Sequence, residues 1–177
     1  MGWSGMMLRR RGLLGGMLAL LGGCGFRPVY GPLGASAGAE QELSAIAVGL
    51  IPNRPGQLLR LALQDRLERG GVGVAQRYDL SVSFSLASER LSIQSGNTSS
   101  RVRVVGTAAW VLTAQDGERR TLRSGSAREV DGYNIFNNQY FASDQENDAV
   151  QRRMTEALSE QIALQLAIYF NQRAAKG

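Results

Sequence analysis

The chain has 177 residues with one cysteine and no histidine, and its formal net charge is +5 at pH 7. The absence of histidine excludes nucleophilic sites that use imidazole as the base, and it excludes zinc sites built on imidazole. One cysteine excludes an intramolecular disulfide, and the length suits a single domain with its own core.

The N-terminal segment predicts an export signal. Three arginines, Arg9–Arg11, precede an apolar run from Leu13 to Leu21 that is much shorter than the ~20 residues of a membrane-spanning helix. The run ends in Leu21-Gly22-Gly23-Cys24, the pattern of a bacterial lipoprotein signal, so residues 1–23 are expected to be removed. An ordinary signal peptide with an incidental thiol is the alternative. The arginines fit either the Sec or the twin-arginine route.

Cys24 is the predicted lipid-attachment residue, with a diacylglycerol on its sulfur and an acyl chain on its nitrogen; no other cofactor and no metal is expected. Gly25 follows it, which favours the outer membrane over inner-membrane retention. Removing residues 1–23 takes away three arginines and no acidic residue, so 154 residues with a net charge of +2 remain. The basic charge of the whole chain therefore does not indicate nucleic-acid binding.

Residues 24–41 are expected to form a lipidated N-terminus and a flexible tether, because Gly31–Gly38 is rich in Gly, Ala, Ser and Pro. The folded domain is then expected over residues 42–177. Its first element is a strand over Leu43–Ile51. A helix follows, with Asn53 as N-cap, Pro55 in its first turn and an end at Gly70-Gly71. Its apolar residues recur at helical spacing and give it one buried face: Leu59, Ala62, Leu63 and Leu67.

The next region predicts a long strand, because apolar residues from Leu80 to Leu86 alternate with serines. Leu91 and Ile93 then fall on the opposite parity, so a bulge is expected near residues 87–90. Residues 94–100 are expected to form a polar loop.

Arg101–Thr113 and Arg119–Asp131 predict a hairpin that turns through Gln115-Asp116-Gly117. A two-residue Asp-Gly turn would place Trp110 opposite Arg123. A three-residue turn with Gly117 in the left-handed conformation gives better pairs and is preferred. It sets the following pairs: Trp110 with Leu122, Val102 with Val130, Arg103 with Glu129, and Arg101 with Asp131.

The outer face of that hairpin is expected to carry small, uncharged side chains, so it could lie against another protein. It carries Thr107, Ala109, Val111 and Thr121.

Ser143 and Glu146 form a capping box that is expected to open a long final helix, which extends to Tyr169 and Phe170. These two aromatic residues are more typical of core than of a partner contact. Four further aromatic residues in an Asn-rich loop either close the end of the core or contact a partner: Tyr133, Phe136, Tyr140 and Phe141. The predicted fold is α+β, a single two-layer domain with a mixed, mostly antiparallel four-stranded sheet and two helices on one face.

No enzyme motif is found. Gly70–Gly73 follows a helix, so it reads as a helix end and not as a nucleotide-binding loop. Asp144, Glu146 and Asp148 offer carboxylates for a paired acid site, but their expected place in the first turn of a helix is explained by the helix dipole.

Three stretches together resemble one family. They are Cys24–Gly31 (CGFRPVYG), Tyr133–Tyr140, and Leu166–Phe170. They resemble the lipopolysaccharide-assembly lipoprotein LptE of alphaproteobacteria, and the resemblance extends over nearly all of the chain after residue 23.

The resemblance implies a non-enzymatic outer-membrane lipoprotein, anchored by lipid, whose domain lies on the periplasmic side and within the lumen of the LptD β-barrel. The two proteins would form a 1:1 heterodimer that places lipopolysaccharide in the outer leaflet. The alternative is a free-standing periplasmic lipoprotein that binds another lipid, peptide or glycan.

Arginine binds phosphate in a bidentate manner, so arginines are the candidate lipopolysaccharide ligands. Arg101 and Arg103 are expected to be ion-paired across the hairpin. The candidate set is therefore Arg90, Arg119, Arg120 and Arg123, although plain solvated arginines explain these positions equally well.

Overall fold

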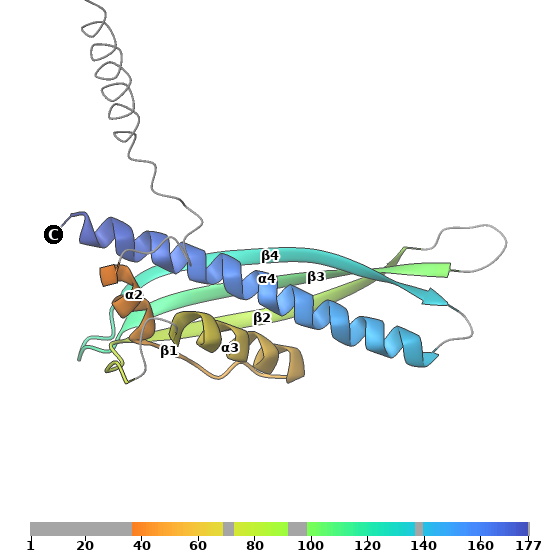
Figure 1. Cartoon of the computed structure of the whole chain (residues 1–177), viewed down its shortest axis with the longest axis horizontal. Coiled ribbons are helices and arrows are strands. Elements are labelled where there is room, and N and C mark those ends of the chain that lie inside the picture. Colours follow the sequence, from red (N-terminus) through yellow and green to blue (C-terminus); the bar gives the residue numbers. More distant parts are fainter. Residues whose placement is uncertain (1–36, 69–72, 92–98, 137–139, 177) are drawn as a thin grey trace, which may run out of the picture. The chain divides into compact units, whose positions relative to one another are not determined.

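The computed structural model describes residues 37–68, 73–91, 99–136 and 140–176, and its strands form one four-stranded sheet. The sheet order is β1-β2-β3-β4, with β1 parallel to β2 and the other neighbours antiparallel. Helices α2, α3 and α4 cover one face (Figure 1). The predicted α+β fold is confirmed, with one helix more than expected. The elements are α2 (Ala37–Ser44), β1 (Ile46–Val48), α3 (Arg54–Leu67), β2 (Tyr78–Leu91), β3 (Ser99–Ala114), β4 (Thr121–Phe136) and α4 (Tyr140–Ala174).

The segment predicted as a strand over Leu43–Ile51 is a helix end followed by a short strand. Helix α2 begins at Ala37, inside the stretch expected to be tether, and β1 holds only Ile46–Val48. Ala39 and Leu43 lie four residues apart on one helical face, and each is only 1% exposed. The apolar residues of this run therefore belong to two elements, α2 and β1, and are buried in both. The rest of the predicted tether lies outside the described residues.

Helix α3 is confirmed, but its start differs in detail. Asn53 occupies the N-cap position with φ 66°, and its side chain makes no capping bond. Its carbonyl instead accepts the N–H of Gln57 at 2.9 Å. Leu59, Leu63 and Leu67 form the buried face that the spacing predicted. Gly70-Gly71, the expected end, lies outside the described residues, and Glu68 is the C-cap.

The bulge predicted near residues 87–90 is wrong, because β2 pairs with β3 without interruption from Tyr78 to Leu91. Burial along β2 declines steadily: Leu80 is fully buried, Leu86 is half-buried and Leu91 is 40% exposed. The end of the strand projects beyond the core, so Leu91 carries no information about which face is buried. Ile93 and residues 94–98 of the predicted loop lie outside the described residues, and Ser99 and Ser100 belong to β3.

Both registers considered for the hairpin are wrong. Trp110 lies opposite Gly125, Val102 opposite Tyr133, and Arg103 opposite Gly132. The turn is wider than expected: Ala114 N–H donates to the Arg120 carbonyl at 2.9 Å, and a register shift occurs between Leu112 and Thr113. Arg119, with φ 48°, takes the left-handed conformation that was assigned to Gly117.

The observed register follows from the volume of Trp110. A Cβ atom at position 125 would lie 2.6 Å from the indole ring, so only glycine fits opposite it. The indole N–H donates to the Gln165 side-chain oxygen of α4 at 3.1 Å, which satisfies the polar atom of a residue that is 2% exposed. Pairing Trp110 with Leu122 would place a large side chain where the ring lies.

Helix α4 begins at Tyr140, before the predicted N-cap Ser143. Strand β4 likewise continues past the expected end to Phe136, so the two elements absorb the aromatic residues assigned to a loop. Tyr133 packs on the small core cluster of Val102, Val104, Val150 and Met154. It therefore closes the far end of the core, which was one of the two alternatives. Phe170 is core, at 2% exposed.

Helix α4 has 35 residues and contributes to both core clusters. Val150 and Met154 belong to the small cluster, whereas Leu158, Ile162 and Leu166 belong to the large one beneath α2 and α3. None of the described helices is both long enough and apolar enough to cross a membrane.

Candidate functional site

The two faces of the sheet differ. The inner face, which we define as the face covered by helices, holds Leu80, Val82, Ala108, Trp110 and Leu112. The outer face is exposed along its centre and is covered by no described element (Figure 1). It includes the predicted Thr107, Ala109, Val111 and Thr121, which are all exposed as expected. Its other central residues are Ser81, Ser83, Ser85, Ser124 and Ser126.

Over β2 and β3 the centre of the outer face is uncharged and built of small side chains, whereas on β4 the exposed Arg128 lies opposite Thr107. From Ser81 to Ser85 on β2 and from Thr107 to Val111 on β3 it presents only hydroxyl, methyl and isopropyl groups. Charged residues are depleted at the centres of protein interfaces. Small side chains also let a partner approach the strands closely. This face is therefore a candidate contact surface.

The candidate arginines near the β3–β4 turn are partly occupied. Arg119 forms an ion pair with Asp79 at 3.1 Å, and Arg120 pairs with Asp116 at 2.9 Å and with Glu118 at 3.4 Å. The hydrogen bond from Arg120 lowers the pKa of Asp116 below its ordinary value of 3.8. Arg123 is exposed and forms no ion pair with any described residue.

Arg90 lies apart from the other three candidates. It pairs with Val102 near one end of β2, whereas Tyr78, beside the β3–β4 turn, is at the other end. Twelve residues of strand at ~3.3 Å each separate the two ends by about 40 Å. The structure thus divides the predicted set into one cluster and one separate arginine. Cys24 lies outside the described residues.

The ion pairs expected for Arg101 and Arg103 are absent. On β4 these arginines lie opposite Asn134 and Gly132, and on β2 they lie opposite Leu91 and Glu89. The acids expected to pair with them bind α4 instead. Arg153 lies 2.8 Å from Asp131, and Gln161 donates to Glu129 at 2.9 Å. The acidic side chains of β4 therefore fix the long helix to the sheet.

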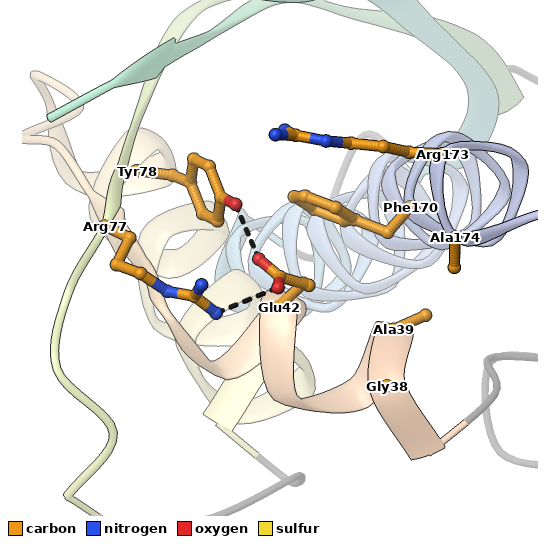
Figure 2. Close-up of a pocket in the computed structure, with 8 residues that line it drawn as sticks. All are labelled: Gly38, Ala39, Glu42, Arg77, Tyr78, Phe170, Arg173 and Ala174. Carbon is orange, nitrogen blue, oxygen red and sulfur yellow. Dashed lines mark hydrogen bonds and ion pairs between the residues drawn. The ribbon is translucent and has the colours of Figure 1, made fainter. Parts of the chain in front are cut away.

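A cavity of about 330 Å³ lies where α2, the start of β2 and the end of α4 meet (Figure 2). Glu42 accepts a hydrogen bond from the Tyr78 hydroxyl and lies 2.9 Å from the guanidinium of Arg77. The rings of Tyr78 and Phe170 are 5.2 Å apart. Burial, and then the hydrogen bond with Glu42, raise the pKa of the Tyr78 phenol above its ordinary value of 10.0.

Sequence reasoning missed this cavity because its lining residues are contributed by positions 38 to 174 and have no common motif. The contacts between its lining residues stabilise the fold: Arg77 and Tyr78, at the start of β2, bind Glu42 of α2. The remaining lining residues are Gly38, Ala39, Arg173 and Ala174.

Asp144, Glu146 and Asp148 were expected in the first turn of the final helix, which is wrong: α4 begins at Tyr140, so they lie beyond its first turn, where the helix dipole has little effect. One of them has a structural role. Asp148 forms an ion pair at 3.3 Å with Arg54, the first residue of α3, and so joins the two helices. Within the described ranges, no three acidic, histidine or cysteine side chains gather in a way that would hold a metal ion.

Comparison with known proteins gives one family. The model of LptE, described as lipopolysaccharide-assembly, matches residues 43–166. No curated protein matches the chain.

The solved structures that are similar include three lipoproteins. A candidate lipoprotein from Caulobacter crescentus CB15 has a TM-score of 0.61 at 24% identity, over 75% of this chain and 96% of that one, which bears on the fold alone. A minor lipoprotein from Acinetobacter baumannii has a TM-score of 0.48 at 17% identity, over 70% and 90%. Rare lipoprotein B from Shewanella oneidensis has 0.48 at 14%, over 74% and 96%. The last two are too distant to carry an argument.

Proposed function

Because the chain belongs to the LptE lipopolysaccharide-assembly family, we propose that it is an outer-membrane lipoprotein, acylated on Cys24, that occupies the lumen of the LptD β-barrel in a 1:1 heterodimer. In this role it assists the assembly of the barrel and helps to place lipopolysaccharide in the outer leaflet. It acts by shape and contact and catalyses no reaction.

The observation that carries this proposal is the extent of the family match. Residues 43–166 run from the end of α2 through the whole sheet and most of α4. The likeness thus covers the folded body and not one short motif. An assembly function that depends on the shape of the whole domain fits a match of that extent.

The outer face supports a contact with the barrel wall. A wall that encloses the domain needs a surface it can approach closely, and over β2 and β3 the centre of this face carries no charge that would have to be desolvated. The exposed Arg128 of β4 lies beside that centre, opposite Thr107. We assign the outer face to the barrel, with Thr107, Ala109 and Val111 near its centre.

The arginine cluster supports binding of an anionic glycolipid. Arg123 has no acidic partner among the described residues, and the pairs of Arg119 and Arg120 are exposed, so a phosphate group could exchange with their carboxylates at low cost. Arg119, Arg120 and Arg123 would then bind one phosphate region of lipopolysaccharide. Arg90 would make a separate contact about 40 Å away.

Detergent extraction of native outer membranes followed by affinity purification of the tagged chain tests the proposal. We expect a stable complex with one large outer-membrane barrel at equal stoichiometry. Recovery of the chain as a lone monomer would instead favour a free-standing lipoprotein.

The lipid anchor is tested separately by the intact mass of the purified chain. We expect three acyl chains on a polypeptide that starts at Cys24. The Cys24→Ala variant serves as the control: it should lack the acyl mass and leave the outer-membrane fraction. A mature chain that begins elsewhere and carries no acyl mass would contradict this part of the proposal.

A further inference from the structure

The cavity where α2, the start of β2 and the end of α4 meet is lined by two cations and one acid. These charged residues are Glu42, Arg77 and Arg173. One carboxylate oxygen of Glu42 lies 2.9 Å from Arg77, and the other accepts the hydrogen bond of the Tyr78 hydroxyl. Both oxygens of the acid are therefore already engaged within the fold.

Arg173 is the cation of this cavity that lacks an acidic partner. It forms no ion pair with another of the described residues. Its guanidinium points toward the Tyr78 hydroxyl (Figure 2). Burial raises the pKa of the Tyr78 phenol, and the charges of Arg77 and Arg173 oppose that rise, so both charges act within the cavity. The guanidinium donors of Arg173 thus face a space in which none of the described carboxylates accepts them.

The helix ends at the cavity do not change the sign of its charge. The first turn of α2 and the last turn of α4 both contribute lining residues. The start of a helix carries a partial positive charge and its end a partial negative charge of similar size, so the two offset each other. The side chains therefore decide the sign, and two guanidinium groups with one carboxylate leave a net charge of +1.

The remaining lining of the cavity is largely apolar. The ring centroids of Tyr78 and Phe170 lie 5.2 Å apart, and Ala39 and Ala174 add methyl groups. The cavity volume of about 330 Å³ is near the lower end of the range for ligand sites, roughly 300–1,000 Å³. That volume suits a compact molecule with an apolar body. It is too small for a large glycolipid with several acyl chains.

We propose that this cavity binds a small organic monoanion, in which one carboxylate or phosphodiester group is carried on a compact apolar body. The anionic group accepts hydrogen bonds from Arg173 and from the N–H groups of Arg77 that Glu42 leaves free. The apolar body packs on the rings of Tyr78 and Phe170. Soluble aromatic or short aliphatic acids have this chemistry, and so does the headgroup region of a phosphatidylglycerol-type lipid.

This site is separate from the arginine cluster beside the β3–β4 turn. Asp79, which binds Arg119, follows Tyr78 directly on β2. Successive side chains of a strand point to opposite faces, so the Arg119 cluster lies on the outer side and the cavity on the inner side. The proposed ligand site requires no barrel partner, and it therefore stands or falls independently of the proposed function.

Titration of the purified full chain in an uncharged detergent, followed by nuclear magnetic resonance, tests the site. The probe is 3-phenylpropionate, which combines one carboxylate with one ring. We expect saturable shifts of the amide signals of Gly38, Tyr78 and Arg173, with a dissociation constant on the order of 1 mM for a ligand of this size. The neutral 3-phenylpropionamide and the small anion acetate should each bind at least about fivefold more weakly, because each lacks one of the two contacts.

A matched pair of variants assigns the binding to Arg173. Arg173→Gln removes an exposed cation at the cavity, and Arg152→Gln removes an exposed cation from another part of the same helix. Arg173→Gln should weaken 3-phenylpropionate binding about fivefold to tenfold and leave the binding of 3-phenylpropionamide unchanged. Arg152→Gln should change neither. Equal weakening by both substitutions would show a response to net charge alone and would overturn the proposal.

The source of the monoanion is decided with lipid added to the detergent micelles. Phosphatidylglycerol supplies the phosphodiester, and diacylglycerol at the same mole fraction is the control without it. Shifts at the lining residues with phosphatidylglycerol alone assign the site to a lipid headgroup, whereas no shift with either lipid assigns it to a soluble acid. Equal shifts with both lipids, no saturable shift with 3-phenylpropionate, or equal binding of its amide would each overturn the anion site.

Discussion

The inner and outer faces of the sheet are built from alternate residues of the same strands, yet they follow opposite rules. On β3 the inner positions hold Val104, Ala108, Trp110 and Leu112, whose sizes vary widely because each must fit a particular part of α4 or β4. From Val105 to Thr113 the outer positions hold only small side chains, whereas Arg101 and Arg103 lie further along the same face. Burial by helices thus demands specific shapes, whereas the exposed centre of the outer face places no such demand on its side chains.

The largest expected loss of stability comes from the inner face. Trp110→Ala should lower the free energy of unfolding by about 3–5 kcal/mol, because it removes a fully packed indole and leaves Gln165 without its donor. Urea denaturation followed by circular dichroism measures the change. Val111→Ala, one residue along on the outer face, should stay within about 0.5 kcal/mol. Similar losses at both positions would contradict the assignment of faces.

A matched pair of adjacent alanines sharpens the comparison. Ala108 is fully buried on the inner face, and Ala109 is exposed on the outer face. Ala108→Phe should cost about 1–3 kcal/mol through overpacking, whereas Ala109→Phe should change stability by no more than about 0.5 kcal/mol. If the outer face meets the barrel wall, Ala109→Phe should nevertheless reduce recovery of the barrel complex. A normal yield of complex would remove Ala109 from the proposed contact.

The arginine cluster should affect ligand binding more than folding. Replacing Arg119, Arg120 and Arg123 together with serine removes only exposed ion pairs, each worth about 0–1 kcal/mol. Lipopolysaccharide binding should weaken and lose part of its dependence on salt, because fewer phosphate contacts remain to be screened. Binding assays at low and high salt measure both effects. An affinity that stays the same at every salt concentration would reject this site.

The smallest effect concerns pH. The folded state raises the pKa of Tyr78, so the stability from its neutral phenol is complete below pH 10 and is lost as the pH rises further. The unmodified chain should therefore lose stability more steeply than Tyr78→Phe as the pH rises above 10. Thermal denaturation of both chains measures the difference, in which the other tyrosines cancel. Parallel curves would show that the phenol titrates as it does in water.

Periodic patterns in the sequence were sufficient for the element types but not for contacts that depend on shape. The serine alternation of β2 and the leucine spacing of α3 each report one buried face, and both predictions hold. The hairpin register depends on Gly125, which is needed only because the Trp110 ring occupies the space above it. Preferences for pairs of side chains across two strands do not reveal that a glycine must lie opposite Trp110. Leu91 led to the wrong prediction of a bulge because it lies beyond the core, where an apolar side chain does not mark the buried face.

Local sequence patterns also gave wrong predictions where contacts between distant parts of the chain decide the structure. The capping box at Ser143 is a genuine helix-start pattern, yet α4 starts earlier because β4 runs on to Phe136 and the chain must turn back at once. The arginine cluster was predictable as a group, but its acidic partners were not. Asp79 is about forty residues from Arg119 in sequence and reaches it only through the sheet.

The position of α4 at the end of the chain has a consequence for biogenesis. Translation and export both deliver the sheet first, and the helix that shields most of it emerges last. A polypeptide cut short after Phe136 would keep all four strands but have no cover over Trp110 and Ala127. Such a fragment is expected to aggregate and be degraded, so premature termination late in the message should be as damaging as termination early in it.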